Sequence, residues 1–253
     1  MKRQIIFFFL FSFVNQKIFS FTLLSPNPPR YTTGEVYVDF TNDSCSQTGF
    51  SPQYLFNLME ESINQFWNKV SSARLLLLKG DFVDVSSAGL DPSSLAAEAR
   101  GNRILVGCND AVAAFASGGV VAVGTMGQFD GETKGSIIIN DHANSEFSTL
   151  SDDKIRALLA HELGHALGLG HSENVSALMY YSLGSKIQEK MSQDDYDALT
   201  YLYPHNPRLM GLGGSCGTIS FDHSKEGEAK WYQSYFLLAL LPLLMALLLR
   251  PLF

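Results

Sequence analysis

Four residues between positions 161 and 171 have the types and spacing of a catalytic metal site. His161 and His165 are four residues apart, so on a helix both imidazoles point from one face, as two ligands of a tetrahedral zinc require. Gly168 can adopt a positive φ and end that helix, and the chain can then turn and bring in His171 as a third ligand. Three neutral nitrogen donors leave a fourth position for water, so the sequence predicts one catalytic zinc ion.

Glu162 directly follows the first of these ligands and can act as general base toward a water at the zinc. A His-Glu-x-x-His stretch alone is only moderately specific for zinc. The third histidine raises that specificity, because imidazoles buried for packing alone would each need a polar partner. The four residues together therefore predict a hydrolytic zinc site.

The stretch from His161 to His171 resembles the zinc-binding motif of the metzincin metalloproteases. Three further features resemble the matrixin branch of that family: Ser172, the Met-turn-like segment Ala177 to Tyr180, and the segment Met191 to Leu199, which is similar to the last helix. The resemblance covers residues 31–205 and is strong from residue 155 onward.

This resemblance implies a zinc endopeptidase domain with an α+β, zincin-like fold. The expected architecture is a mixed twisted sheet of about five strands with three helices, and an active-site helix below the sheet. Met179 would form an apolar floor under the metal without binding it. A protein or peptide substrate would lie antiparallel to an edge strand, Gly119 to Thr125.

The sequence is compatible with two alternative roles for Tyr181. Matrixins often have proline at this offset, whereas astacin-like and serralysin-like metzincins have a tyrosine that binds zinc or stabilises the oxyanion. Tyr181 is therefore either a catalytic residue or part of the wall of the substrate pocket. Calcium could bind loop aspartates, but the sequence contains no recognisable calcium-binding motif.

Alternating and apolar runs predict the elements around this site. Strands are expected at 34–40, 73–79, 103–108, 120–125 and 136–140, and helices at 52–69, from 152 to 168 and from 192 to 204. The stretch 81–101 is rich in Ser, Gly and Asp and is expected to be a loop, with a short helical turn at 93–99.

The two ends of the chain are more apolar than its middle. Residues 1–20 combine a short basic start with a run of about ten apolar residues, which predicts a secretory signal peptide. After a catalytic domain at 31–205, residues 206–230 read as a Gly-rich and polar linker, and residues 231–253 as an apolar membrane or sorting segment. The protein is therefore expected to be exported, and either held at a membrane or cell surface or released after processing of its tail.

Composition narrows the remaining function classes. A net charge of −7 disfavours a general nucleic-acid binder, which normally carries a basic face. Three cysteines exclude a disulfide-dense scaffold. In an oxidising compartment Cys45 and Cys108 could pair, which leaves Cys216 as the odd cysteine.

The leading hypothesis is an exported zinc-dependent endopeptidase, with a monomer favoured. One alternative is a surface binding or adhesion protein on a metzincin scaffold, against which the intact Glu162 argues because a scaffold needs no general base. Another is a protease dedicated to a single partner.

Overall fold

The computed structural model describes residues 21–43, 45–113, 115, 119–182 and 188–205. The chain divides into two compact units, Met1–His205 and Asn206–Phe253, and the second unit lies outside the described residues. The fold below is therefore that of the first unit.

A five-stranded mixed sheet forms the centre of this unit. Its strands are β1 (Glu35–Thr41), β2 (Leu76–Val83), β3 (Arg103–Asn109), β4 (Ala122–Phe129) and β5 (Glu132–Asn140), in the spatial order β2-β1-β3-β5-β4. The pairs β1/β2, β1/β3 and β3/β5 are parallel, and β4 pairs antiparallel with β5. A hairpin turn at Asp130 and Gly131, both at positive φ, joins β4 to β5, and the strand order leaves β4 at one edge of the sheet.

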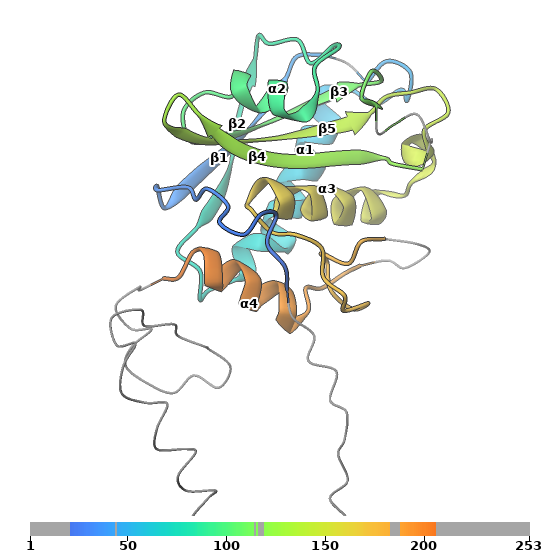
Figure 1. The fold of residues 1–253 in the computed structure, drawn as a ribbon. Coiled ribbons are helices and arrows are strands. Elements are labelled where there is room, and N and C mark those ends of the chain that lie inside the picture. The colour runs from blue at the N-terminus through green and yellow to red at the C-terminus, as the bar shows by residue number, and fades with distance from the viewer. Residues whose placement is uncertain (1–20, 44, 114, 116–118, 183–187, 206–253) are drawn as a thin grey trace, which may run out of the picture. The chain divides into compact units, whose positions relative to one another are not determined.

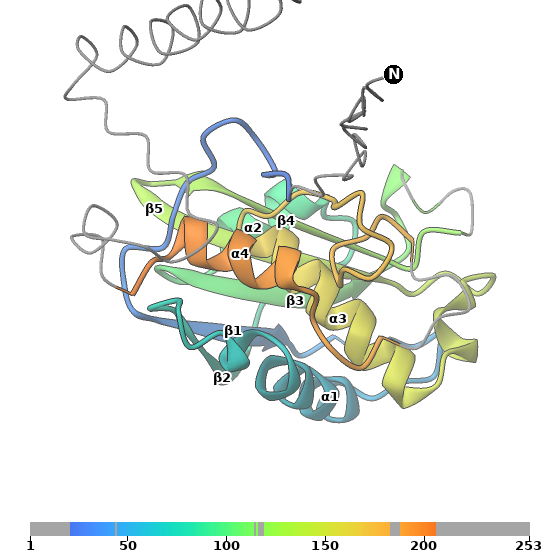
Figure 2. The same cartoon turned by 90° about the horizontal axis from the view of Figure 1, so that it is seen from below.

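Helices cover both faces of the sheet (Figure 1). They are α1 (Pro52–Gln65), α2 (Pro92–Glu98), α3 (Asp152–Ala166) and α4 (Gln193–Leu202), with short 3₁₀ turns at Trp67–Lys69 and Glu146–Thr149. α2 lies on one face above a small apolar cluster, and α1 and α3 lie on the other over the main core. Figure 2 shows α1, α3 and α4 together on this second face, so the main core lies between the sheet and α3.

The expected α+β metzincin-like fold is confirmed. Three helices were expected, and the described residues form four. The fourth helix, α2, lies in the stretch 81–101, where the sequence predicted a loop with a short helical turn at 93–99. Asp91 caps α2 by accepting a hydrogen bond from the Ser94 N–H at 2.8 Å, and Leu95 and Ala96 are buried against the sheet. The helix is too short to show an amphipathic period, so its burial, which local sequence does not reveal, decides its formation.

One strand is displaced from its expected position. β2 begins and ends later than the predicted 73–79, because the chain continues as a strand through Gly80 and Asp81. A side chain at Gly80 would place its Cβ 2.1 Å from Asp39 Oδ1, so this strand needs a glycine where the buried Asp39 carboxylate approaches it. The acidic and glycine residues that indicated a loop are therefore part of the strand.

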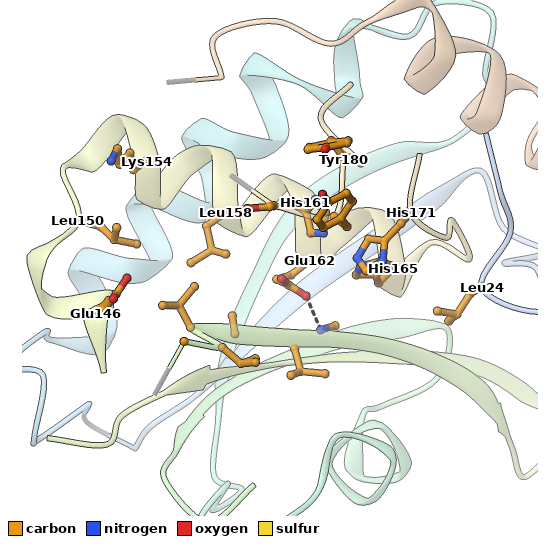
Figure 3. A pocket seen from close by; sticks show the side chains of 18 residues that line it. Leu24, Glu146, Leu150, Lys154, Leu158, His161, Glu162, His165, His171 and Tyr180 are labelled. Carbon is orange, nitrogen blue, oxygen red and sulfur yellow. Dashed lines mark hydrogen bonds between the residues drawn. The ribbon is translucent and has the colours of Figure 1, made fainter. Parts of the chain in front are cut away.

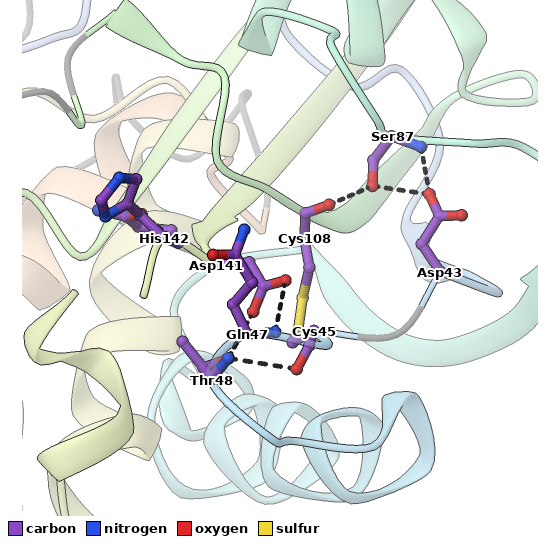
Figure 4. Close-up of a disulfide and its surroundings, with 9 residues drawn as sticks. Asp43, Cys45, Gln47, Thr48, Ser87, Cys108, Asp141 and His142 are labelled. Atoms are coloured by element: carbon purple, nitrogen blue, oxygen red, sulfur yellow. Dashed lines mark hydrogen bonds between the residues drawn. A yellow bond between two sulfur atoms is a disulfide. The ribbon is translucent and has the colours of Figure 1, made fainter. Parts of the chain in front are cut away.

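Cys45 and Cys108 form a disulfide, with their Cα atoms 5.3 Å apart (Figure 4). The bond joins the connection after β1 to the end of β3. The neighbouring Asp141 carboxylate accepts hydrogen bonds from the Thr48 N–H at 2.9 Å and from the Thr48 hydroxyl at 2.7 Å. Together these contacts fix the loop after β1 to the ends of the parallel strands.

Removing this disulfide should lower the free energy of unfolding by about 4 kcal/mol, because the bond closes a long loop in the unfolded chain. The two cysteines are 63 residues apart in sequence. We expect a Cys45→Ser/Cys108→Ser double variant to unfold at lower denaturant concentration than the oxidised protein. Cys216→Ser serves as the thiol-removal control, and an unchanged midpoint in the double variant would contradict the prediction.

The ends of the chain stay predictions. The predicted signal peptide 1–20 and the segments 206–230 and 231–253 lie outside the described residues. Among the residues that are described, no helix is long and apolar enough to cross a membrane.

Candidate metal and catalytic site

Helix α3 is buried and carries three of the four residues predicted between positions 161 and 171, namely His161, Glu162 and His165. Asp152 and Asp153 lie in its first turn, where carboxylates interact favourably with the helix dipole. The helix packs between β4 and α1, and the Trp67 indole donates a hydrogen bond to the Ala160 carbonyl at 2.8 Å. Because α3 is covered on both sides, its site side chains are held by packing.

Two tyrosine hydroxyls hold the end of α3 that precedes the turn. Tyr31 donates to the Ala166 carbonyl at 3.1 Å, and Tyr203 donates to the Leu167 carbonyl at 2.8 Å. These bonds satisfy carbonyls that a helix end leaves without partners. Gly168 then takes a φ of 100°, as the sequence predicted, and the chain turns toward His171.

The segment at the start of the described chain lies along this turn. Leu23 and Leu169 form an antiparallel bridge, and the Leu24 N–H donates to the Gly168 carbonyl at 2.9 Å. The Thr22 hydroxyl donates to the His171 carbonyl at 2.5 Å. The loop that carries the third histidine is therefore held by this segment from Gly168 to His171.

The three histidines converge as the sequence predicted (Figure 3). One ring nitrogen from each lies within 4.8 Å of the others, and the Nε2 atoms of His165 and His171 are 3.2 Å apart. Two nitrogens bound to one tetrahedral zinc would be about 3.3 Å apart, from a metal–nitrogen distance of about 2.05 Å. The closest pair of donors therefore has the spacing of two ligands of one zinc ion, and the three imidazoles together could hold a single ion.

Backbone carbonyls orient the two helical histidines. His161 Nδ1 lies 2.8 Å from the Leu178 carbonyl, and His165 Nδ1 lies 2.8 Å from the Leu169 carbonyl. A carbonyl can only accept, so each Nδ1 is the protonated nitrogen and each Nε2 carries the free lone pair. This is the tautomer that a zinc ligand needs, and the carbonyls act as outer-shell partners.

Burial keeps these imidazoles neutral. It lowers the pKa of both His161 and His165 to about 4, and it also lowers the pKa of the more exposed His171. At neutral pH no proton has to leave these nitrogens before a cation binds.

Glu162 lies beside the histidines with only 6% of its surface exposed. Its Oε2 accepts a hydrogen bond of 2.6 Å from the Gly124 N–H on β4, marked in Figure 3. Burial raises the pKa of the Glu162 carboxyl, while its electrostatic interaction with the His165 imidazole and the Gly124 hydrogen bond oppose that rise. A carboxylate with a raised pKa is a better match to proton transfer near neutral pH.

The segment Ala177 to Tyr180 forms a turn beneath the histidines. Met179 is buried, and a Cβ at Gly164 on α3 would lie 2.2 Å from the Met179 sulfur. The Ser172 N–H donates to the Met179 carbonyl at 2.8 Å, which ties the turn to the residue after His171. The apolar floor expected at Met179 therefore packs directly on the helix that carries the ligands.

Asp195, which was not among the predicted site residues, holds this turn. Its carboxylate is 1% exposed and accepts from the N–H groups of Leu178 at 2.8 Å and Met179 at 3.0 Å. It also closes a capping box with Ser192 at the start of α4. The Ser-x-x-Asp spacing could indicate the capping box, but no local signal indicates the contact with the turn.

A cleft of about 660 Å³ runs between α3 and the edge strand β4. It is lined on the strand side by residues 119–124 and on the helix side by Leu158, Glu162 and the histidines. The segment Gly119 to Thr125, expected as the edge strand beside the site, is placed there, although the strand itself is Ala122–Phe129.

Tyr181 lines the same cleft with 65% of its surface exposed. Its ring lies 4.3 Å from that of Tyr180, centroid to centroid. This position suits either a pocket wall or a group near the reacting carbonyl, so the catalytic role of Tyr181 stays a prediction.

Residues 109–204 match the family model described as matrixin. This chain contains a matrixin-like metzincin domain. The matrixin match covers β4, β5, α3 and α4, and the structure joins them in one unit with β1, β2 and α1, which precede the match.

Several curated relatives resemble the matrixin part of the chain. Metalloendoproteinase 2-MMP of Arabidopsis thaliana is 27% identical over 107 residues, which are 42% of this chain and 28% of the relative. Interstitial collagenase of Bos taurus is 31% identical over 104 residues, 38% of this chain and 22% of the relative. Matrilysin of Homo sapiens is 49% identical over 45 residues, 17% of each chain. These matches support a zinc metalloendopeptidase catalytic domain, and the chain spans only about a quarter of the length of the first two relatives.

Proposed function

We propose that this protein is an exported zinc-dependent endopeptidase. The observation that carries the proposal is the convergence of His161, His165 and His171 on one point beside Glu162, in a cleft along a sheet edge. The match to matrixin supports it, as does the similarity to the metalloendoproteinase relatives.

The three histidines would hold the ion, and Glu162 would carry the proton. When bound, zinc supplies a Lewis acid that polarises a carbonyl and lowers the pKa of water toward ~7. Glu162 takes the proton of the attacking water and returns it to the leaving amine. The Gly124 N–H engages one oxygen of this carboxylate and leaves the other for that water. Tyr181, at the cleft surface, is the candidate for a further hydrogen bond to the oxyanion.

The substrate backbone is proposed to add to the edge of β4. The Asn140 N–H donates to the Val121 carbonyl, so odd-numbered residues of this strand direct their main-chain groups toward β5. Ala122 and Gly124 therefore direct theirs away from the sheet, into the cleft. Because the Gly124 N–H is bound to Glu162, an extended peptide could pair with the remaining main-chain groups of this edge, as in other cases of strand addition.

The binding-protein alternative is less consistent with the site. Burying the ionisable carboxyl group of Glu162 costs free energy, and an apolar side chain at this position would avoid that cost. A protein that used the fold only as a binding scaffold would gain nothing in return. A protease dedicated to one partner uses the same residues, and only a test on different substrates separates it from a general endopeptidase.

Export is supported by the disulfide as well as by the signal-like start of the chain. Disulfides form and persist in oxidising compartments and are rare in the cytosol. Cys45 and Cys108 are bonded in the folded domain. We therefore place the mature protein outside the cytosol, with residues 231–253 as its proposed membrane or sorting segment.

We expect the purified chain, kept in mild detergent because of its apolar ends, to cleave members of a mixed quenched-peptide library. A zinc chelator should abolish cleavage and added zinc should restore it, because three neutral imidazoles hold the ion reversibly. Cleavage that persists in chelator without bound zinc would contradict the proposal.

A panel of unrelated protein substrates then separates a general enzyme from a dedicated one. Cleavage of several proteins supports the general enzyme. A folded, zinc-loaded protein that cleaves no member of either set would favour the dedicated protease or the binding protein.

A further inference from the structure

We propose that Gly124 is a positioning residue for Glu162, acting through its main-chain N–H and through its lack of a side chain. The inference rests on the proposed function, in which Glu162 is the general base. The edge strand β4 would then have two roles: it borders the cleft, and it fixes the Glu162 carboxylate that carries the proton.

The first support is the position of Gly124 in the sheet. Gly124 pairs with Ile137 of β5, and its main-chain groups point away from that strand, as the Asn140–Val121 hydrogen bond establishes for the register. Because β4 is an edge strand, this N–H has no sheet partner. Its partner is Glu162 Oε2, at 2.6 Å and in a buried setting.

This hydrogen bond satisfies two groups at once. A buried N–H without an acceptor is costly, and a buried carboxylate without a donor is costlier still. With Oε2 held by Gly124, the Glu162 side chain loses rotational freedom before any substrate binds. A preorganised base needs no rearrangement at the moment of proton transfer.

The second support is the closeness of the strand to the helix. A Cβ built on Gly124 would lie 2.2 Å from the Glu162 carbonyl oxygen and 2.9 Å from its carbonyl carbon. Both atoms belong to the main chain of α3, so no side-chain rotation can relieve the contact. On the same face of β4, Ala122 and Met126 have side chains, and only the position opposite Glu162 is glycine.

An alanine at position 124 would push α3 and β4 apart and stretch the hydrogen bond that orients Glu162. The histidines lie on α3 and on the loop after it, so they can move together with the helix and still bind zinc. The base would then be misplaced relative to the strand along which the substrate is proposed to lie.

Amide hydrogen exchange of Gly124 tests the hydrogen bond without using activity. In the zinc-loaded protein labelled with ¹⁵N-glycine, we expect the Gly124 N–H to be protected although it belongs to an edge strand. Glu162→Ala should remove that protection, and Glu162→Gln, which keeps an acceptor oxygen, should retain most of it. Equal exchange in the unchanged protein and in Glu162→Ala would overturn the inference.

Kinetics then test positioning. We expect Gly124→Ala to lower kcat about 100-fold, as displacements of about 1 Å can do, with KM little changed and one zinc per chain. Gly34→Ala is the matched control, because a Cβ there meets only the Arg74 carbonyl at 3.7 Å. Wild-type kcat in a folded Gly124→Ala protein would contradict the proposal.

An ester in place of the amide at position 124 removes the N–H without adding volume, and it serves if the alanine variant fails to fold. We expect kcat to fall about tenfold, since a hydrogen bond to a charged group is lost. An ester protein with unchanged kcat would overturn the inference. If the unmodified protein cleaves nothing, the proposed function fails, while the exchange experiment still decides whether Gly124 holds Glu162.

Discussion

Replacing Glu162 by alanine should leave zinc bound and lower kcat/KM by about 10³-fold or more. Glu162 is not among the three residues proposed to hold the ion, all of which are histidines, so metal content should not change. The general base is lost, and the alanine side chain offers no atom that can accept the proton of the attacking water. Peptide cleavage and zinc content, measured on the same sample, check both parts of this expectation.

Two comparisons make the Glu162 result specific. Glu162→Gln keeps the shape and the acceptor for the Gly124 N–H but cannot take a proton, so it should be nearly as inactive as the alanine variant. Glu98→Ala removes an exposed carboxylate on α2, on the opposite face of the sheet, and should retain full activity. A Glu162→Ala protein that cleaves peptides at the normal rate would show that another group is the base.

Replacing Asp195 by alanine should lower the free energy of unfolding by at least about 3 kcal/mol. The carboxylate accepts hydrogen bonds from the N–H groups of Leu178, Met179 and Ser192, and alanine would leave these donors without an acceptor. We also expect zinc affinity to fall about 10- to 100-fold, because the Leu178 carbonyl orients His161. Denaturant unfolding and competition with a chelator measure the two effects.

Asp197→Ala provides the matched control for Asp195. It lies on the same helix but is exposed, and its hydrogen bond to Gln193 is a surface contact worth a few tenths of a kcal/mol. If Asp195→Ala were as stable as Asp197→Ala and bound zinc equally well, the turn at Met179 would not depend on this carboxylate.

The metal-binding part of the site could be predicted because its geometry is local. His161 and His165 are fixed relative to each other by one turn of helix, and Gly168 permits the turn that brings in His171. Most strands were predictable for a similar reason, since β1, β3 and β5 are apolar or alternating runs. The limits of β2 were predicted wrongly, and α2 was predicted only as a short helical turn, because burial against distant residues, more than local pattern, determines both elements.

The sequence by itself therefore predicted the proposed ligands, the proposed base and the class of fold, all of which depend on residues close together along the chain. Only the tertiary structure decided which groups surround them. Gly124 and Glu162 are 38 residues apart, Asp195 and Leu178 are 17 apart, and Cys45 and Cys108 are 63 apart. Such contacts depend on strand order and on how closely helices pack against the sheet, which no periodicity within a single segment encodes.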